Sequence, residues 1–148
     1  MDKPADPHPL DPDPAVLAEL DRLDAACRAA PGEIPPQIAL WTAVAALERW
    51  VFINRGTPEA VRPYVIAADA GQMLCIYSSA TRATAAAHDS GLVPSGETVP
   101  LFSIPLPAAI DWALSLGERG VAGVVLDYPQ VAAWSPLPNL ERLRPTPE

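Results

Sequence analysis

The spacing of apolar residues changes along the chain from a helical period to a strand period. Apolar residues at positions 16, 20, 23 and 27 recur every three to four residues, which predicts an amphipathic helix. Asp13 followed by Pro14 is typical of a helix start, and Pro31 is typical of the segment after a helix end. A second helix is expected over residues 36–49, with Ile38 and Trp41 on its apolar side. The first third of the chain is therefore expected to be helical.

Short apolar runs follow and predict five strands, over residues 50–53, 64–67, 73–77, 99–104 and 121–126. A helix is expected from Ser78 and Ser79 to about Asp89, and another after Pro105 and Pro107. The resulting order is α-α-β-β-β-α-β-α-β, and its last five elements form two consecutive β-α-β units. We therefore predict a mixed α/β (α+β) fold with one five-stranded mixed sheet and flanking helices.

Proline is concentrated towards both ends of the chain and makes up 19 of its 148 residues. Residues 1–12 alternate proline and aspartate with small residues, so they are expected to form a disordered leader. Residues 13–143 are assigned to a single α/β domain, and residues 144–148 to a flexible tail.

The chain carries 18 acidic and 10 basic residues, for a net charge of −8. The basic residues are scattered, whereas nucleic acids and anionic lipids are bound by clustered lysine and arginine. We therefore expect no nucleic-acid partner and no membrane partner. No apolar run is long enough to span a bilayer, and no secretion signal follows Met1, which predicts a cytoplasmic location.

The motifs indicate neither a metal nor a cofactor. Cys27 and Cys75 fall at apolar positions, and neither His8 nor His88 has a partner at a metal-ligand spacing. A phosphate-binding loop, a dinucleotide fingerprint and a nucleophile elbow are all missing from the sequence. His88 lies next to Asp89, but adjacent helical side chains point in different directions and do not form a triad. We predict no catalytic residues and no enzymatic activity.

Polar residues follow the predicted third and fifth strands and are our candidates for a ligand site. If the third, fourth and fifth strands are parallel, their ends, including Pro105, meet at one rim, where open sheets usually bind ligands. A helix N-terminus with a nearby arginine favours an anion. The alternative is that the serines cap a helix, the arginine is solvated and the aspartate caps a helix or opens a turn. The candidate residues are Ser78, Ser79, Thr81, Arg82, Asp127 and Tyr128.

Trp134 stands apart from the other tryptophans because it lies in the proline-rich segment 128–136. It either packs that segment onto the domain or forms an exposed anchor of a protein interface.

Four segments together resemble a known family. Residues 40–44 read LWTAV, residues 50–53 WVFI, residues 75–83 CIYSSATRA and residues 120–129 GVAGVVLDYP. Over roughly residues 36–130 this pattern is similar to the SseB family (serine-sensitivity enhancing protein, N-terminal domain). YSS stands where the family usually has Phe-Thr-Ser, and DYP stands where it usually has Asn-Pro. The resemblance implies a small bacterial α/β interaction module without established catalytic residues.

The function predicted from the sequence is a non-enzymatic protein-interaction or accessory domain, SseB-like, whose partner is another protein. The chain is expected to be a monomer or a weak homodimer. The alternative is a small-ligand or anion-binding domain, or a weak enzyme, that uses the rim of parallel strand ends. A narrower version of the first hypothesis is an acidic antitoxin or immunity protein that covers a basic toxin, since the net charge is −8.

Overall fold

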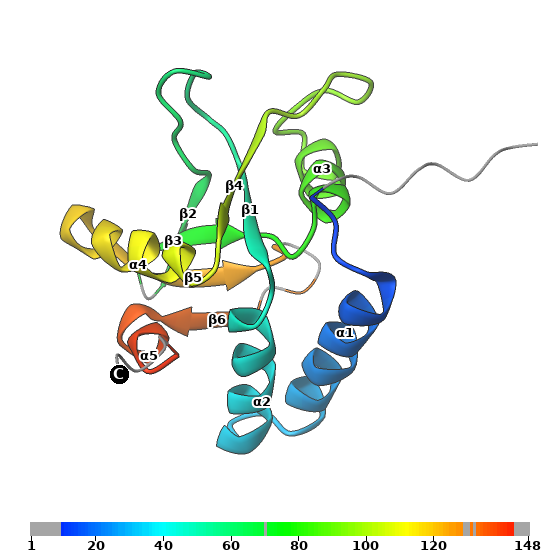
Figure 1. The fold of residues 1–148 in the computed structure, drawn as a ribbon, viewed down its shortest axis with the longest axis vertical. Coiled ribbons are helices and arrows are strands. Elements are labelled where there is room, and N and C mark those ends of the chain that lie inside the picture. The colour runs from blue at the N-terminus through cyan, green and yellow to red at the C-terminus, as the bar shows by residue number, and fades with distance from the viewer. Residues whose placement is uncertain (1–9, 70, 129–130, 132, 144–148) are drawn as a thin grey trace, which may run out of the picture.

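The computed structural model describes residues 10–69, 71–128, 131 and 133–143 (Figure 1). It confirms the prediction of a mixed α/β chain. The order differs from the predicted one because a 3₁₀ helix precedes β5, and a strand and a helix follow it. The elements are α1 (Pro14–Ala29), α2 (Ile34–Ala45), β1 (Arg49–Ile53), β2 (Val65–Ala68), β3 (Gly71–Ile76), α3 (Ala80–Asp89), β4 (Leu101–Pro105), α4 (Ala108–Ser115), η1 (Leu116–Arg119), β5 (Val121–Leu126), β6 (Ala133–Pro136) and α5 (Leu137–Glu141).

The strands form two sheets, and the prediction of one five-stranded sheet was wrong. The larger sheet has the order β2-β3-β5-β6, with β3 and β5 parallel and the two outer pairs antiparallel. β1 and β4 form a separate antiparallel ribbon, which a bridge between Val51 and Tyr77 joins to the end of β3. Figure 1 shows this ribbon running across the strands of the larger sheet. The apolar run of β4 predicts a strand, but it carries no information on which strand it pairs with.

The starts of α1 and α3 follow the predicted capping, whereas α2 begins at Ile34, before the predicted start at residue 36, without a side-chain cap. The Asp13 carboxylate accepts a hydrogen bond from the Ala15 N–H at 3.0 Å, and the chain enters α1 there. The predicted apolar stripe of α1 is only partly buried, since Leu20 is 2% exposed whereas Val16 is 39% exposed. Within the part of the chain that the structure describes, no helix combines the length and hydropathy that a membrane crossing requires.

Two apolar clusters cover the two faces of the central strands. Successive strand side chains alternate, so Leu74 and Ile76 of β3 join a cluster with α2, α4 and α5, whereas Met73 and Cys75 pack under α3. The same alternation buries β5 on both faces, as its almost unbroken apolar run predicts. Cys75 is buried and Cys27 is half-buried, and both are free thiols.

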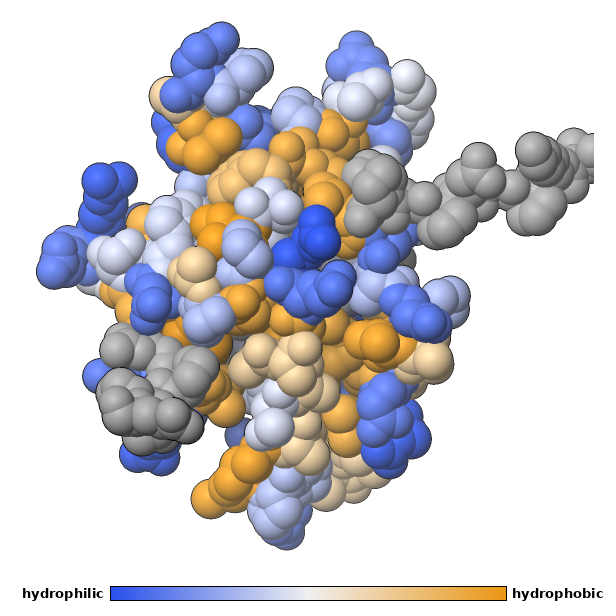
Figure 2. Space-filling view, viewed as in Figure 1, coloured by the Kyte–Doolittle hydropathy of each residue, from blue (hydrophilic) through white to orange (hydrophobic). Residues whose placement is uncertain are grey.

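Part of the predicted apolar side of the second helix faces solvent. Ile34 and Ile38 of α2 lie one turn apart and are 65% and 59% exposed. Figure 2 shows apolar surface over α2 on this side of the molecule. Trp41, by contrast, is buried, so α2 packs with the face that carries Trp41 and Leu40.

The proline-rich segment after β5 forms β6 and α5, which the sequence pattern left unassigned. β6 pairs with β5, and Pro136 lies opposite Gly123. A Cβ added to Gly123 would meet the Ser135 carbonyl oxygen at 2.4 Å, so the close approach of the two strands requires glycine. Pro136 is tolerated here because β6 is an edge strand, so the N–H that proline lacks is not needed to bond a further strand. Trp134 lies on β6 and is 50% exposed, so it remains available as the interface anchor that the sequence allows.

Candidate functional site

The rim predicted from the sequence is present where β3 and β5 end side by side. These strands are parallel, so their ends bring Ser78 next to Asp127. The Asp127 carboxylate accepts hydrogen bonds from the Ser78 N–H at 2.8 Å and from the Ser78 hydroxyl at 2.6 Å. Asp127 is buried and has a φ of 48°, a left-handed conformation that aspartate adopts more readily than most residues. Pro105 does not belong to this rim, because it lies opposite Arg49 in the other sheet.

Arg82 connects this pair to α1. One nitrogen of its guanidinium donates to Asp127 at 3.0 Å, and the other donates to Asp21 at 2.8 Å. Burial works against the charge of Arg82, but the bonds to Asp21 and Asp127 outweigh it and raise the pKa of this arginine. The Asp127 side chain is only 2% exposed, so removal of either partner would leave the other charge poorly compensated.

The N-terminus of α3 is closed by two further oxygen groups of the chain. Ser79 Oγ accepts from the Arg82 N–H at 3.0 Å. The Asp11 carboxylate accepts from the Thr81 N–H at 3.1 Å and also from the Thr81 hydroxyl. Leu10 packs against the apolar cluster under α3, so residues 10–12 of the predicted leader lie against this helix. Residues 1–9 of the leader and the predicted tail at 144–148 lie outside the described residues.

These contacts form one structural unit, which we call the carboxylate clasp. It joins three carboxylates to donors on and beside the first turn of α3: Asp11, Asp21 and Asp127 with Ser78, Thr81 and Arg82. The donors that the sequence assigned to an external anion are therefore bonded to carboxylates of the same chain. The hollow beside Asp11 and Ser78 has a volume of about 10 Å³, which is room for roughly one water molecule. Tyr128, the remaining candidate, lies outside the clasp, and its carbonyl oxygen accepts a hydrogen bond from the Tyr77 hydroxyl at 3.0 Å.

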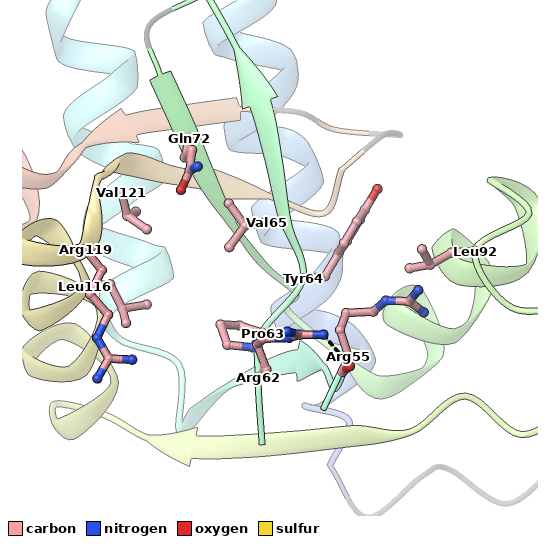
Figure 3. Close-up of a pocket in the computed structure, with 10 residues that line it drawn as sticks. All are labelled: Arg55, Arg62, Pro63, Tyr64, Val65, Gln72, Leu92, Leu116, Arg119 and Val121. Atoms are coloured by element: carbon pink, nitrogen blue, oxygen red, sulfur yellow. Dashed lines mark hydrogen bonds between the residues drawn. The ribbon is translucent and has the colours of Figure 1, made fainter. Parts of the chain in front are cut away.

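A much larger hollow, of about 510 Å³, lies around the start of β2 and extends over the beginnings of β3 and β5 (Figure 3). We call it the arginine groove. Three arginine side chains stand around a mainly apolar floor in which tyrosine, glutamine and proline supply the remaining contacts. The lining residues are Arg55, Arg62, Pro63, Tyr64, Val65, Gln72, Leu92, Leu116, Arg119 and Val121.

Arg55 and Arg62 stand at the neck of the hairpin loop over residues 55–62. The Arg55 N–H donates to the Arg62 carbonyl at 2.7 Å, and the Arg62 guanidinium donates to the Arg55 carbonyl at 3.2 Å. Asn54 organises the loop, since its buried Oδ1 accepts from the N–H groups of Gly56 at 2.8 Å and Arg62 at 3.0 Å. An added Cβ at Gly56 would meet the Ala60 carbonyl oxygen at 2.2 Å, so the turn requires glycine. The loop therefore presents both arginines from a fixed base.

Arg119 reaches the groove from η1. This short helix ends at Gly120, whose φ of 95° turns the chain into β5. Figure 3 shows Arg119 and Leu116 on one side of the groove, whereas Arg55 extends towards Leu92 on the other. The two sides of the groove thus each carry a guanidinium.

The three guanidiniums of the groove have no carboxylate partner among the described residues, although the whole chain has 18 acidic residues against 10 basic ones. The ion pairs of the described residues engage other arginines: Arg22, Arg28, Arg49 and Arg82. Burial, followed by Cys75 and Tyr128, raises the pKa of Tyr64 against the opposing effect of Arg55, so its hydroxyl stays a neutral donor. Guanidiniums and a hydroxyl beside apolar surface suit a carboxylate or phosphate carried on an apolar body.

Sequence reasoning missed this groove because its arginines form no run. Positions 55 and 62 are brought together by a loop closure that depends on Asn54, and position 119 arrives through the pairing of β5 with β3. The sequence carries no local signal for either event.

Comparison with known proteins places the chain in no family. No protein-family model and no curated protein matches it. The resemblance to the SseB family therefore stays a prediction. Among the described residues, no three histidine, cysteine, aspartate or glutamate side chains converge as a metal ion would require.

Proposed function

We propose that this chain is a non-enzymatic protein-interaction domain that recognises an acidic surface of its partner through the arginine groove. One observation carries the proposal: three arginines that have no carboxylate partner among the described residues surround a groove of about 510 Å³, in a chain whose net charge is −8. The net charge of the chain repels an acidic partner, whereas the three arginines of the groove attract it. Such a contrast fixes where the partner binds more strongly than it raises the affinity.

The proposal differs from two sequence-based alternatives. The hypothesis of a basic toxin as partner follows from the negative net charge alone. The groove is positively charged and would repel a basic partner. A small anion at the rim has less support, because the donors of Ser78, Thr81 and Arg82 are already bonded to Asp11, Asp21 and Asp127. A cytoplasmic location and a monomeric or weakly dimeric state remain part of the proposal.

The test compares two triple variants of equal charge. The groove variant is R55Q/R62Q/R119Q, and the control variant is R22Q/R49Q/R142Q, whose positions lie outside the groove. Each tagged protein is used to capture partners from host lysate at about 50 mM and about 300 mM salt, because exposed charge contacts weaken as the Debye length shortens. The expected result is one stoichiometric partner that the wild type and the control variant retain at low salt, and that the groove variant retains at least about tenfold less, a loss of roughly 1.4 kcal/mol.

The same comparison can overturn the proposal. Equal capture by both triple variants would remove the groove from the function. A captured partner whose contact region, mapped by cross-linking, is basic would favour the toxin hypothesis instead.

A further inference from the structure

The outer edge of β2 has backbone groups without a strand partner. β2 is the first strand of its sheet, and among the described strands it pairs with β3 alone. The Cys75 N–H donates to the Tyr64 carbonyl at 3.1 Å, so Val65 and Leu74 are a non-hydrogen-bonded pair of this antiparallel ladder. The N–H and C=O groups of Val65 and, two residues on, Ala67 therefore point away from β3. Within the described part of the chain, neither residue makes a backbone hydrogen bond on that side.

The arginine groove meets this edge at Val65 and takes in Tyr64 just before β2, so it includes side chains from both faces of the strand. Its floor continues over Gln72 of β3 and Val121 of β5. Tyr64 packs on the face of the cluster under α3, and Val65 packs on the face of the other cluster. The lining continues with Leu92 on the side of Tyr64 and with Leu116 on the side of Val65, as Figure 3 shows. A strand added to β2 would direct its alternate side chains to these two faces in turn.

The charge of the groove selects the kind of strand. Arg55 and Arg119 stand on opposite sides of the groove, and neither is paired with a carboxylate of the described residues. An added strand with carboxylates could therefore meet a guanidinium on either face. The proline-rich end segments of this chain, 1–9 and 144–148, are poor candidates by sequence, since each proline lacks the N–H that a ladder needs.

We propose that the arginine groove binds an extended acidic segment of a partner protein, which adds as a strand to the free edge of β2. This inference rests on the proposed function and specifies its partner. The backbone groups of Val65 and Ala67 would supply affinity, and the arginines would supply the preference for acidic sequences. The four residues of β2 set the length of the added strand at about four to six residues.

The test uses synthetic peptides with the full chain. The probe is a capped seven-residue peptide in which glutamate alternates with valine. One control peptide has lysine in place of glutamate. Two further control peptides keep glutamate but carry N-methyl groups at alternate residues, one at the odd positions and the other at the even positions. A further probe is single-stranded oligothymidine of similar charge. Binding is measured by titration, and the amide exchange of Val65 and Ala67 is followed by NMR.

The expected result has three parts. The acidic peptide binds the wild type at least about tenfold more tightly than it binds R55Q/R62Q/R119Q. The lysine peptide binds the wild type at least about tenfold more weakly than the acidic peptide does. N-methylation in one register weakens binding by about tenfold or more, because it removes the donors that face β2. Saturation slows the exchange of the Val65 and Ala67 amides by at least about tenfold.

Each other outcome overturns a specific claim. If both N-methylated peptides bind as well as the parent and exchange is unchanged, strand addition is wrong while an acidic partner in the groove stands. If oligothymidine binds as tightly as the acidic peptide, the preference for an acidic protein segment is wrong. If the chain alone is a dimer that protects the same two amides, the occupant is a second copy. If no anionic probe distinguishes the wild type from the arginine variant, the proposed function fails too, and the arginines only guard an exposed strand edge.

Discussion

The carboxylate clasp and the arginine groove both hold arginine in an acidic chain, but they differ in how the charge of that arginine is compensated. In the clasp, Asp127 and Asp21 of the same chain hold the Arg82 guanidinium at 3.0 Å and 2.8 Å. In the groove, Arg55 and Arg119 have no such partner among the described residues. The clasp leaves room for roughly one water, whereas the groove offers about 510 Å³.

This difference separates an arginine whose anion the chain itself supplies from arginines whose charge the described residues leave uncompensated. A compensated centre contributes to folding, because its hydrogen bonds join segments that are distant in the sequence. An uncompensated centre contributes little to folding and remains available to a partner. Substitutions in the clasp should therefore change stability without changing binding, and substitutions in the groove should do the reverse.

The largest effect is expected from Asp127→Asn. The change keeps a residue type that tolerates the φ of 48°, but it removes the charge that Arg82 and the Ser78 hydroxyl face. We expect the free energy of unfolding to fall by about 3 kcal/mol, as for other buried pairs that lose one partner. Urea denaturation measures this change. The control is Asp89→Asn, an exposed carboxylate at the end of α3, expected to cost less than about 0.5 kcal/mol. Equal costs for the two variants would show that the clasp has no special role.

The second effect concerns the base of the groove. Asn54→Ala removes the acceptor for the N–H groups of Gly56 and Arg62, which would then lose their partner inside the loop. We expect a loss of about 2 kcal/mol in stability, together with weaker binding of the acidic peptide because the two loop arginines are no longer fixed. Thr57→Val is the matched control, since it removes one exposed bond to the Ala60 N–H and leaves Asn54 intact. Unchanged peptide affinity in Asn54→Ala would show that loop order does not position the arginines.

The clasp also shows which parts of the candidate site could be predicted from the sequence. The clasp residues Ser78, Arg82 and Asp127 could be predicted to lie together, because a capped helix after β3 and an acidic residue after β5 are local patterns, and β3 and β5 are parallel. That they bond to one another and to Asp11 and Asp21 could not be predicted. Those carboxylates come from the predicted leader and from the exposed side of α1, where a solvated surface gives the same sequence pattern.

The arrangement of the strands into two sheets could not be predicted from the sequence either. The runs over β1, β4 and β5 are all short and apolar, so each predicts a strand but none specifies its neighbour. β6 and α5 were missed because Pro136 and Pro138 are typical of a linker. An edge strand tolerates Pro136 at its end, and a helix tolerates Pro138 in its first turn. The groove depends on the sheet order, since β2 and β5 flank β3 at its floor.

A third substitution would make the groove resemble the clasp. Gln72→Glu places a carboxylate of the chain among the arginines without a change in side-chain length. We expect the acidic peptide to bind about fivefold more weakly, a change of about 1 kcal/mol, with stability unchanged within about 0.5 kcal/mol. Gln37→Glu adds the same charge on the exposed side of α2 and is the control. If both variants bind the peptide equally well, net charge rather than internal compensation determines the affinity.

The smallest effect concerns Asp24, a carboxylate beside the clasp that receives no donor from α3. Burial raises its pKa above 3.8; Arg28, at 2.9 Å, opposes this, and the charges of Asp21 and Asp127 add to it. The folded chain thus holds this proton more tightly than the unfolded chain, so the contribution of Asp24 to stability is present at low pH and is lost as pH rises from 3.8 through its folded pKa. In Asp24→Asn this dependence should be absent, and the stability of the variant relative to the wild type should rise with pH over that window and then level off. Urea denaturation of both proteins at closely spaced pH values measures the difference. A relative stability that falls with pH would show that Arg28 outweighs burial and compensates Asp24 as fully as Arg82 compensates Asp127.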